Sequence, residues 1–249
     1  MGFKCGIVGL PNVGKSTLFN ALTKSSIPAE NFPFCTIEPN VGKVPLPDNR
    51  LKKLNDIVNS KKIIPASLDL VDIAGLVKGA SQGEGLGNAF LSNIREMNAL
   101  AHVVRCFEDE NITHVDGSID PVRDAEIINL ELIMSDLETV SKRILKCEKL
   151  LKTNDKKNKA EHEILLKIKS ELDQGKLINI ESFNKDERLI IRSFQLLSTK
   201  PTFYIANISD DRSSDDALNK LIEFANLSGN TVIPTSIKIE QEIAILDEE

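Results

Sequence analysis

The chain has no tryptophan and only one tyrosine and ten phenylalanines among its 249 residues. Such a small set of aromatic side chains argues against a surface that binds nucleic acid by base stacking. Its four cysteines are far apart and form no Cys-x-x-Cys pair, which indicates a reduced, cytosolic chain. No segment approaches the roughly 20 apolar residues of a membrane span, and no signal peptide precedes the first apolar run. We therefore expect a cytoplasmic protein with no membrane partner.

The net charge of −6 is unevenly distributed. An acidic chain is not a general binder of polyanions, so DNA is not an expected partner. Between Lys142 and Lys169, however, ten basic and four acidic residues give a local charge of +6, which leaves −12 on the remainder. A stretch of this kind could contact RNA, although charged helix faces are more often simply solvated.

Apolar runs alternate with helical patterns along most of the chain. The runs predict strands at residues 3–8, 41–46, 67–71, 101–107, 201–206 and 231–234. The helical patterns cover residues 15–23, 49–58, 86–98 and 215–227, with Asp48 and Ser214 as candidate N-caps. This alternation predicts an α/β fold with a mostly parallel six-stranded sheet and flanking helices.

The alternation stops between Asp124 and Leu197, where apolar residues recur three and four positions apart. A polar turn at residues 154–158 divides this stretch into two helical stripes, which predicts a helical hairpin inserted into the α/β domain. The expected domains are an α/β domain of residues 1–124 and 200–249 and a hairpin domain of residues 125–199.

Residues 9–16 read GLPNVGKS and fit the phosphate-binding P-loop pattern GxxxxGKS between a strand and a helix. In such a loop the backbone N–H groups converge on an anion. Lys15 adds a positive charge near the β- and γ-phosphates, and the Ser16 hydroxyl can ligate Mg²⁺. The predicted nucleotide-binding residues here are Asn12, Val13, Gly14, Lys15, Ser16 and Thr17.

A second phosphate motif, Asp72-Ile-Ala-Gly75, lies at the end of a later strand. It predicts that Asp72 supports Mg²⁺ and that the Gly75 N–H approaches a γ-phosphate. Five glycines between residues 75 and 87 are typical of a loop that reorders as a switch. Thr36 is expected to be a further Mg²⁺ ligand. This assignment depends only on its place in the sequence between the two phosphate motifs.

A base-reading loop is expected after a late strand, where Asn207-Ile208-Ser209-Asp210 stands in place of the guanine-reading Asn-Lys-x-Asp. Asn207 can bond to an adenine or a guanine edge. Ile208 replaces the lysine whose stem usually covers the base, while Asp210 keeps guanine recognition possible. Ser236, after the last predicted strand, is expected in a second base-contacting loop.

Together these segments closely resemble the YchF-type, Obg-like ATPases. The resemblance is carried by residues 9–17, 31–42 (NFPFCTIEPNVG), 72–96 (DIAGLVKGASQGEGLGNAFLSNIRE), 102–109 (HVVRCFED), 120–134 (DPVRDAEIINLELIM) and 236–243 (SIKIEQEI). It implies a Ras-like P-loop NTPase domain with an inserted helical hairpin. It also implies Mg²⁺-dependent hydrolysis of ATP in preference to GTP, and a ribosomal or rRNA partner.

The chain departs from the family pattern in two places. The family's base motif ends in Glu, whereas this chain has Asp210, which is nearer to the guanine-reading pattern. The family continues into a small β-rich TGS domain, which is not expected in this chain. We expect the chain to be a monomer. We expect its nucleotide to be ATP, with GTP as an alternative.

The group that would orient the attacking water is not obvious, because Leu76 stands where related GTPases carry Gln. Of the three histidines, His102 lies in an apolar strand and His162 is expected to face solvent. His114, in a polar loop, could position the water, and Lys15 and His114 would then be the catalytic residues. His114 could also be a plain loop histidine. Asn12 could help to hold K⁺.

The sequence therefore favours a slow, ribosome-associated ATPase that acts as a nucleotide-dependent switch. Two alternatives remain: a GTPase or dual ATP/GTP switch, and a nucleotide-gated adaptor whose hydrolysis is incidental.

Overall fold

The computed structural model describes residues 2–24, 39–73, 86–109, 117–150, 156–211 and 213–246, without the side chains of 86–89 and 156. One six-stranded sheet has the order β2-β3-β1-β4-β5-β6. All neighbouring strands are parallel except β2, which runs antiparallel to β3. The strands are β1 (Phe3–Val8), β2 (Asn40–Pro45), β3 (Ser67–Asp72), β4 (Ala99–Arg105), β5 (Thr202–Asn207) and β6 (Val232–Thr235). The predicted α/β sheet is confirmed, with strand ends displaced by one or two residues.

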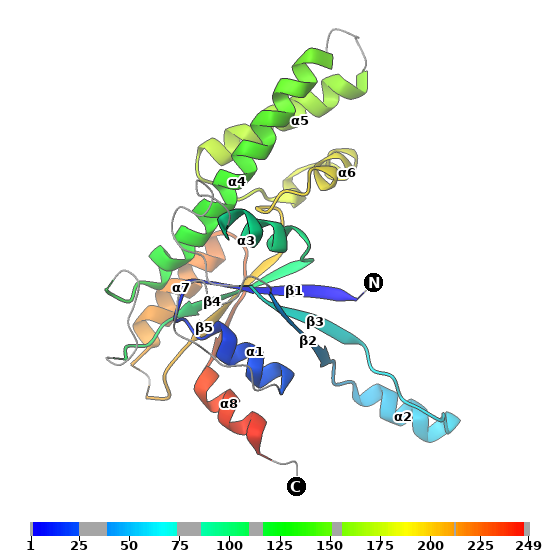
Figure 1. Cartoon of the computed structure of the whole chain (residues 1–249), viewed down its shortest axis with the longest axis vertical. Coiled ribbons are helices and arrows are strands. Elements are labelled where there is room, and N and C mark those ends of the chain that lie inside the picture. The colour runs from blue at the N-terminus through cyan, green and yellow to red at the C-terminus, as the bar shows by residue number, and fades with distance from the viewer. Residues whose placement is uncertain are drawn as a thin grey trace.

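Helices cover both faces of this sheet. Figure 1 shows α1 and α8 on one side and α3 and α4 on the other. The helices are α1 (Lys15–Thr23), α2 (Asn49–Val58), α3 (Leu86–Arg95), α4 (Pro121–Leu150), α5 (Lys156–Asp173), α6 (Lys185–Phe194), α7 (Asp215–Leu227) and α8 (Ile237–Ile245). Helix α3 ends three residues before the predicted Asn98, and α8 was not predicted. Among the described residues, no helix has the length and apolar character needed to cross a membrane.

The central strands are apolar along their length because helices cover both of their faces. Every residue of β4 is buried, as are the last four residues of β1. Ile7, Ile73, Ile94 and Val103 are fully buried in one cluster that joins β1, α3 and β4. This core fixes the carboxyl ends of the strands, where the predicted nucleotide motifs lie.

Helix α4 has 30 residues, about 45 Å of helix, and extends well past the sheet with α5 packed along it (Figure 1). A separate apolar cluster fills the seam between them and includes Val140, Ile144, Leu165 and Ile168. The predicted helix pair is therefore present. Helix α4 runs across residue 125 without a break, and the division into two domains at that point remains a prediction.

His162 does not face solvent as expected. The residue is half-buried, and its Nε2 atom is buried with no hydrogen-bond partner in the part of the chain that the structure describes. Position 162 lies three residues before the buried Leu165, so it falls on the flank of the apolar stripe of α5. Helical periodicity, not the local charge of the sequence, decides its environment.

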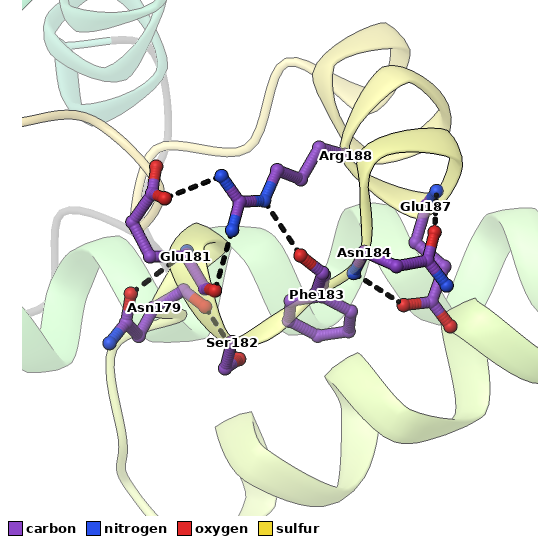
Figure 2. Close-up of polar contacts among 7 residues, drawn as sticks. All are labelled: Asn179, Glu181, Ser182, Phe183, Asn184, Glu187 and Arg188. Atoms are coloured by element: carbon purple, nitrogen blue, oxygen red, sulfur yellow. Dashed lines mark hydrogen bonds and ion pairs between the residues drawn. The ribbon is translucent and has the colours of Figure 1, made fainter.

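A short segment with a 3₁₀ turn (Ile180–Ser182) connects α5 to α6 and is held by Arg188, as Figure 2 shows. The guanidinium donates to the backbone oxygens of Glu181 and Phe183, each at 2.7 Å, and also pairs with the Glu181 carboxylate. Asn184 caps α6 by accepting from the N–H groups of Asp186 and Glu187 at 3.0 Å, while the Glu187 carboxylate accepts from the Asn184 N–H. These local bonds give the return segment a defined path, and its Ile178 and Phe183 side chains are buried in the core cluster of the helix pair.

Asp136 joins α4 to the segment that enters β5. Its fully buried carboxylate accepts hydrogen bonds from the Leu197 N–H at 2.9 Å, the Ser198 N–H at 2.8 Å and the Ser198 Oγ at 2.6 Å. Burial raises the pKa of Asp136, and these three donors oppose the rise. Nearby, the Lys200 ammonium donates to the Arg95 carbonyl at 3.0 Å, which connects the same segment to the end of α3.

We predict that Asp136→Ala lowers the free energy of unfolding by about 3 kcal/mol, because two backbone N–H groups lose their buried acceptor. Urea denaturation followed by circular dichroism measures the change. Glu138→Ala is the matched control: Glu138 lies on the same helix with a 62% exposed side chain, and its ion pair with Lys142 contributes less than about 1 kcal/mol. Equal losses of unfolding free energy in the two variants would contradict the proposed role of Asp136 in connecting α4 to the segment before β5.

Candidate functional site

The loop between β1 and α1 presents uncapped backbone N–H groups at the start of a helix. Asn12 and Gly14 have positive φ values of 61° and 101°. Gly14 is the N-cap of α1, and a glycine has no side chain that could accept a hydrogen bond from the first N–H groups of the helix. A Cβ on Gly14 would lie 2.7 Å from Asn207 Nδ2, so both the backbone angle and the space require glycine. The result is an anion-binding helix N-terminus of the kind that the P-loop motif predicts.

Lys15 is only 7% exposed, and its ammonium donates to the Leu10 carbonyl at 2.8 Å. Burial lowers the pKa of this lysine from 10.5 to about 8, against the opposing effect of the nearby Asp72 carboxylate. The chain thus keeps a cation inside a loop of backbone N–H groups. A bound phosphate would restore its charge balance.

Asp72 and Ser16 meet across 56 positions of sequence. The Ser16 hydroxyl donates to Asp72 Oδ2 at 2.8 Å, and Asp72 is 7% exposed. Asp72 Oδ1 is buried and has no hydrogen-bond partner among the described residues. Burial raises the pKa of Asp72, whereas the Ser16 bond and the Lys15 charge lower it.

The Ser16 and Asp72 oxygens fit a magnesium ion. Mg²⁺ binds through one or two carboxylate or hydroxyl oxygens and completes its shell with water and substrate phosphates. The unpartnered Asp72 Oδ1 is an acceptor of this kind, and within the described residues no group of three His, Cys, Asp or Glu side chains offers a complete protein shell. The geometry therefore suits a metal shared with a phosphate ligand.

The parallel register explains why these groups lie together. Ile7 pairs with Asp72 on one side of β1, and Val8 pairs with His102 on the other. The carboxyl ends of β3 and β1 are thus level with the start of the loop, while β4 continues for three residues beyond it to Arg105. His102 is buried against the Tyr204 ring, and burial together with the Lys15 charge lowers its pKa to about 3. A histidine that stays neutral in the core agrees with a structural role for His102.

Asn207 ties the loop to the far half of the sheet. Its Nδ2 donates to the Val13 carbonyl at 3.0 Å, and its Oδ1 accepts from the Ile237 N–H at 3.3 Å. The sequence predicted a base-reading role for Asn207. The structure places it at the phosphate loop, and its base-reading role remains a prediction. The contribution of Ile237 was missed, although Ser236 followed by nine residues without Gly or Pro was a usable helix signal.

Asp210 and Ser236 lie together at the ends of β5 and β6. The Ser236 hydroxyl donates to one carboxylate oxygen of Asp210, Oδ1, at 2.6 Å. The second carboxylate oxygen, Oδ2, takes no part in this bond. Ser236 is the N-cap residue that connects β6 to α8, and its contact with a base remains a prediction. Ile208 packs against the cluster of Tyr204, Ala206 and Leu221, so the residue in the usual lysine position serves the core.

One cap prediction holds in part, and three site predictions are not tested. Ser214 is the N-cap residue of α7 as predicted, but its side chain makes no capping hydrogen bond, and its Oγ instead accepts from the Ser209 N–H at 3.0 Å. Thr36, Gly75 and His114 lie outside the described residues, so the structure does not place them.

We predict that the affinity for ATP with Mg²⁺ falls by up to about tenfold for each pH unit above about 8. Above that pH Lys15 is neutral in the protein without nucleotide, so Lys15 must take up a proton when the phosphates bind. Calorimetric titrations between pH 7 and about 10 measure the effect, with Lys15→Met as the variant that should bind weakly and without this slope. Lys24→Gln, at an exposed position, should keep the wild-type slope. A flat wild-type profile would contradict the assignment of the cation.

Comparisons with known proteins agree with this geometry. A family model described as "50S ribosome-binding GTPase" matches residues 4–135. The chain is 51% identical over 250 residues to "Ribosome-binding ATPase YchF" of Escherichia coli O157:H7, and 50% identical over 253 residues to the protein of that name in Bacillus subtilis strain 168. Each alignment covers all of this chain and 69% of the relative. The solved structure of the Schizosaccharomyces pombe YchF GTPase is 39% identical with a TM-score of 0.81, covering 99% of this chain and 68% of that one.

Proposed function

The chain belongs to the YchF family, and we propose that it is a cytoplasmic, ribosome-associated P-loop ATPase. It binds ATP with Mg²⁺ and slowly hydrolyses the β–γ anhydride to ADP and phosphate, as a nucleotide-dependent switch. The carrying observation is the cluster of Lys15, Ser16 and Asp72, which places a buried cation and two oxygen ligands at an uncapped helix N-terminus.

We propose a role for each residue of the site, from its position where the structure describes it and from its motif for Thr36 and Gly75. The backbone N–H groups of residues 12–17 and the Lys15 ammonium hold the phosphates and neutralise charge that develops on them during hydrolysis. Ser16, Asp72 and Thr36 would hold Mg²⁺, which would supply positive charge that stabilises the negative charge of the phosphates. Asn207 fixes the loop through Val13 and presents its remaining N–H to the base. Gly75 offers its N–H to the γ-phosphate.

Two observations support a ribosomal partner. The relatives are named for ribosome binding, and the matching family model is also described as ribosome-binding, although as a GTPase. The stretch between Lys142 and Lys169, with its charge of +6, is the proposed rRNA contact of the helical hairpin. Neutralising Lys156, Lys157 and Lys159 should flatten the salt dependence of ribosome binding.

We predict that the chain binds an ATP analogue more tightly than a GTP analogue when both are titrated by calorimetry with Mg²⁺. Ile208 is engaged in the core and gives no stem over a guanine, and Ser236 already occupies Asp210 Oδ1. Residual GTP binding depends on Asp210, so Asp210→Ala should lower it at least tenfold, ~1.4 kcal/mol, and leave ATP binding nearly unchanged.

Asp215→Ala, at an exposed position in the first turn of α7, is the control and should change neither affinity. Equal or tighter binding of GTP would make the protein a dual or GTP-specific switch. That alternative is favoured by Asp210 itself and by the S. pombe relative, whose structure is titled a GTPase.

We propose His114 as the group that positions the attacking water, because Leu76 cannot form a hydrogen bond to it. His114→Ala should lower ATP turnover about 100-fold, with ATP affinity retained. Phosphate release under saturating ATP measures turnover, and His162→Ala on α5 is the matched control. Wild-type turnover in the His114 variant would remove this role.

We also propose that Asn12 helps to bind K⁺ beside the phosphates, where it would substitute for an absent arginine. Turnover should then be faster in K⁺ than in Na⁺, and Asn12→Ala should remove the difference. Equal turnover of the wild-type chain in both salts would contradict a K⁺ site.

A further inference from the structure

Residues 46–66, here called the α2 arm, project from the sheet between β2 and β3. The Leu46 N–H donates to the Ala66 carbonyl at 2.8 Å, which closes the base of the arm. Figure 1 shows α2 standing away from the rest of the chain beyond these strands. No residue of α2 is buried. The arm is thus an element whose side chains contribute almost nothing to the core.

The ten residues of α2 are too few for a stable isolated helix, because helices below about 12 residues are marginal in water. The structure compensates locally: Asp48 accepts from the Arg50 N–H at 2.9 Å, and Asn59 ends the helix in the left-handed conformation. Caps of this kind contribute about 1 kcal/mol each. A capped helix without a core is therefore an element shaped for contact with something outside the chain.

The charge of the arm is opposite to that of the body. Five basic and two acidic residues give residues 46–66 a charge of +3. Together with the +6 between Lys142 and Lys169, this leaves −15 on the rest of a chain of −6. The described residues provide no ion-pair partner for four ammonium groups of the arm, those of Lys52, Lys53, Lys61 and Lys62. Their charge is available to an anionic partner.

We propose that the α2 arm is a second RNA-binding element, which contacts the phosphate backbone of ribosomal RNA through Lys52, Lys53, Lys61 and Lys62. The inference rests on the proposed ribosomal function and adds a surface to it. Lysines that contact phosphates give affinity without sequence preference, as a ribosome-docking surface requires.

An apolar protein groove is the competing occupant, because Leu54, Ile57 and Ile64 are 56%, 77% and 74% exposed. The position of Arg50 argues against it. Residues 50, 54 and 57 share one face of the helix, and Arg50 is 85% exposed and bonded to Asp48 on that face. A dry groove would bury this ion pair at a desolvation cost, whereas a wet RNA surface leaves it solvated.

The test compares three variants of the full chain on deproteinised ribosomal RNA and on purified ribosomes over a range of KCl concentrations. The first replaces Lys53, Lys61 and Lys62 with Gln. The second, its charge-matched control, replaces the exposed Lys24, Lys185 and Lys220 with Gln. The third, Leu54→Ser with Ile57→Ser, reduces the apolar face. Affinity for an ATP analogue, which should be unchanged in all three, reports that the site is intact.

The slope of log K against log[KCl] is negative, and the arm variant should make it less steep by about 2. Each lost phosphate contact accounts for roughly 0.7 to 0.9 of this change. The control and the serine variant should keep slopes close to that of the wild type. Equal slopes for the arm variant and the control would overturn the inference. So would loss of ribosome binding in the serine variant alone, which would identify a protein groove as the partner.

The proposed ribosomal function and the proposed role of the α2 arm can be contradicted separately. A wild-type chain that does not sediment with ribosomes overturns the proposed ribosomal function. Binding to deproteinised RNA then still decides the role of the α2 arm.

Discussion

The parallel pairing of β1 with β3 and β4 is the constraint on which the site depends. It sets Asp72 level with Ile7, so that the carboxylate lies beside the first turn of α1 and accepts from Ser16. A one-residue slip would turn Asp72 to the opposite face of the sheet. The apolar core of β1, β4 and α3 therefore does more than stabilise the fold, because it fixes the register that assembles the phosphate site.

The site also concentrates unfavourable burial. Lys15 and Asp72 are each 7% exposed, and burial shifts the pKa of each toward its neutral form. Within the described part of the chain, Asp72 Oδ1 adds a buried acceptor without a hydrogen-bond partner. Groups of this kind lower the stability of the protein without its ligand, and a triphosphate with its metal ion would supply the charges that they lack. The same arrangement suits the joint binding of an anion and a cation.

Outside the site, the molecule separates charge between its body and its projections. The hairpin and the α2 arm are basic, while the remainder carries −15. The two projections leave the body in different directions, as Figure 1 shows. An acidic body disfavours general adhesion to RNA, so contact is restricted to surfaces where basic side chains project beyond it. The Asp136 bonds and the Lys200 contact with α3 connect one of these projections to the sheet at the amino ends of β4 and β5, across the sheet from the nucleotide site.

The sequence by itself determined the alternation of strands and helices, the hairpin pattern and the phosphate motif, because each is written in local periodicity or in adjacent residues. It could not determine that Asn207 would hold Val13 and Ile237, or that Ser236 would bond to Asp210. Helix α8 was missed because its first residues were assigned to a loop, and the inward position of His162 was missed because local charge was weighed above helical periodicity. The contacts of Asn207 and Ser236 depend on which distant segments meet, and only the packing of helices on the sheet decides that.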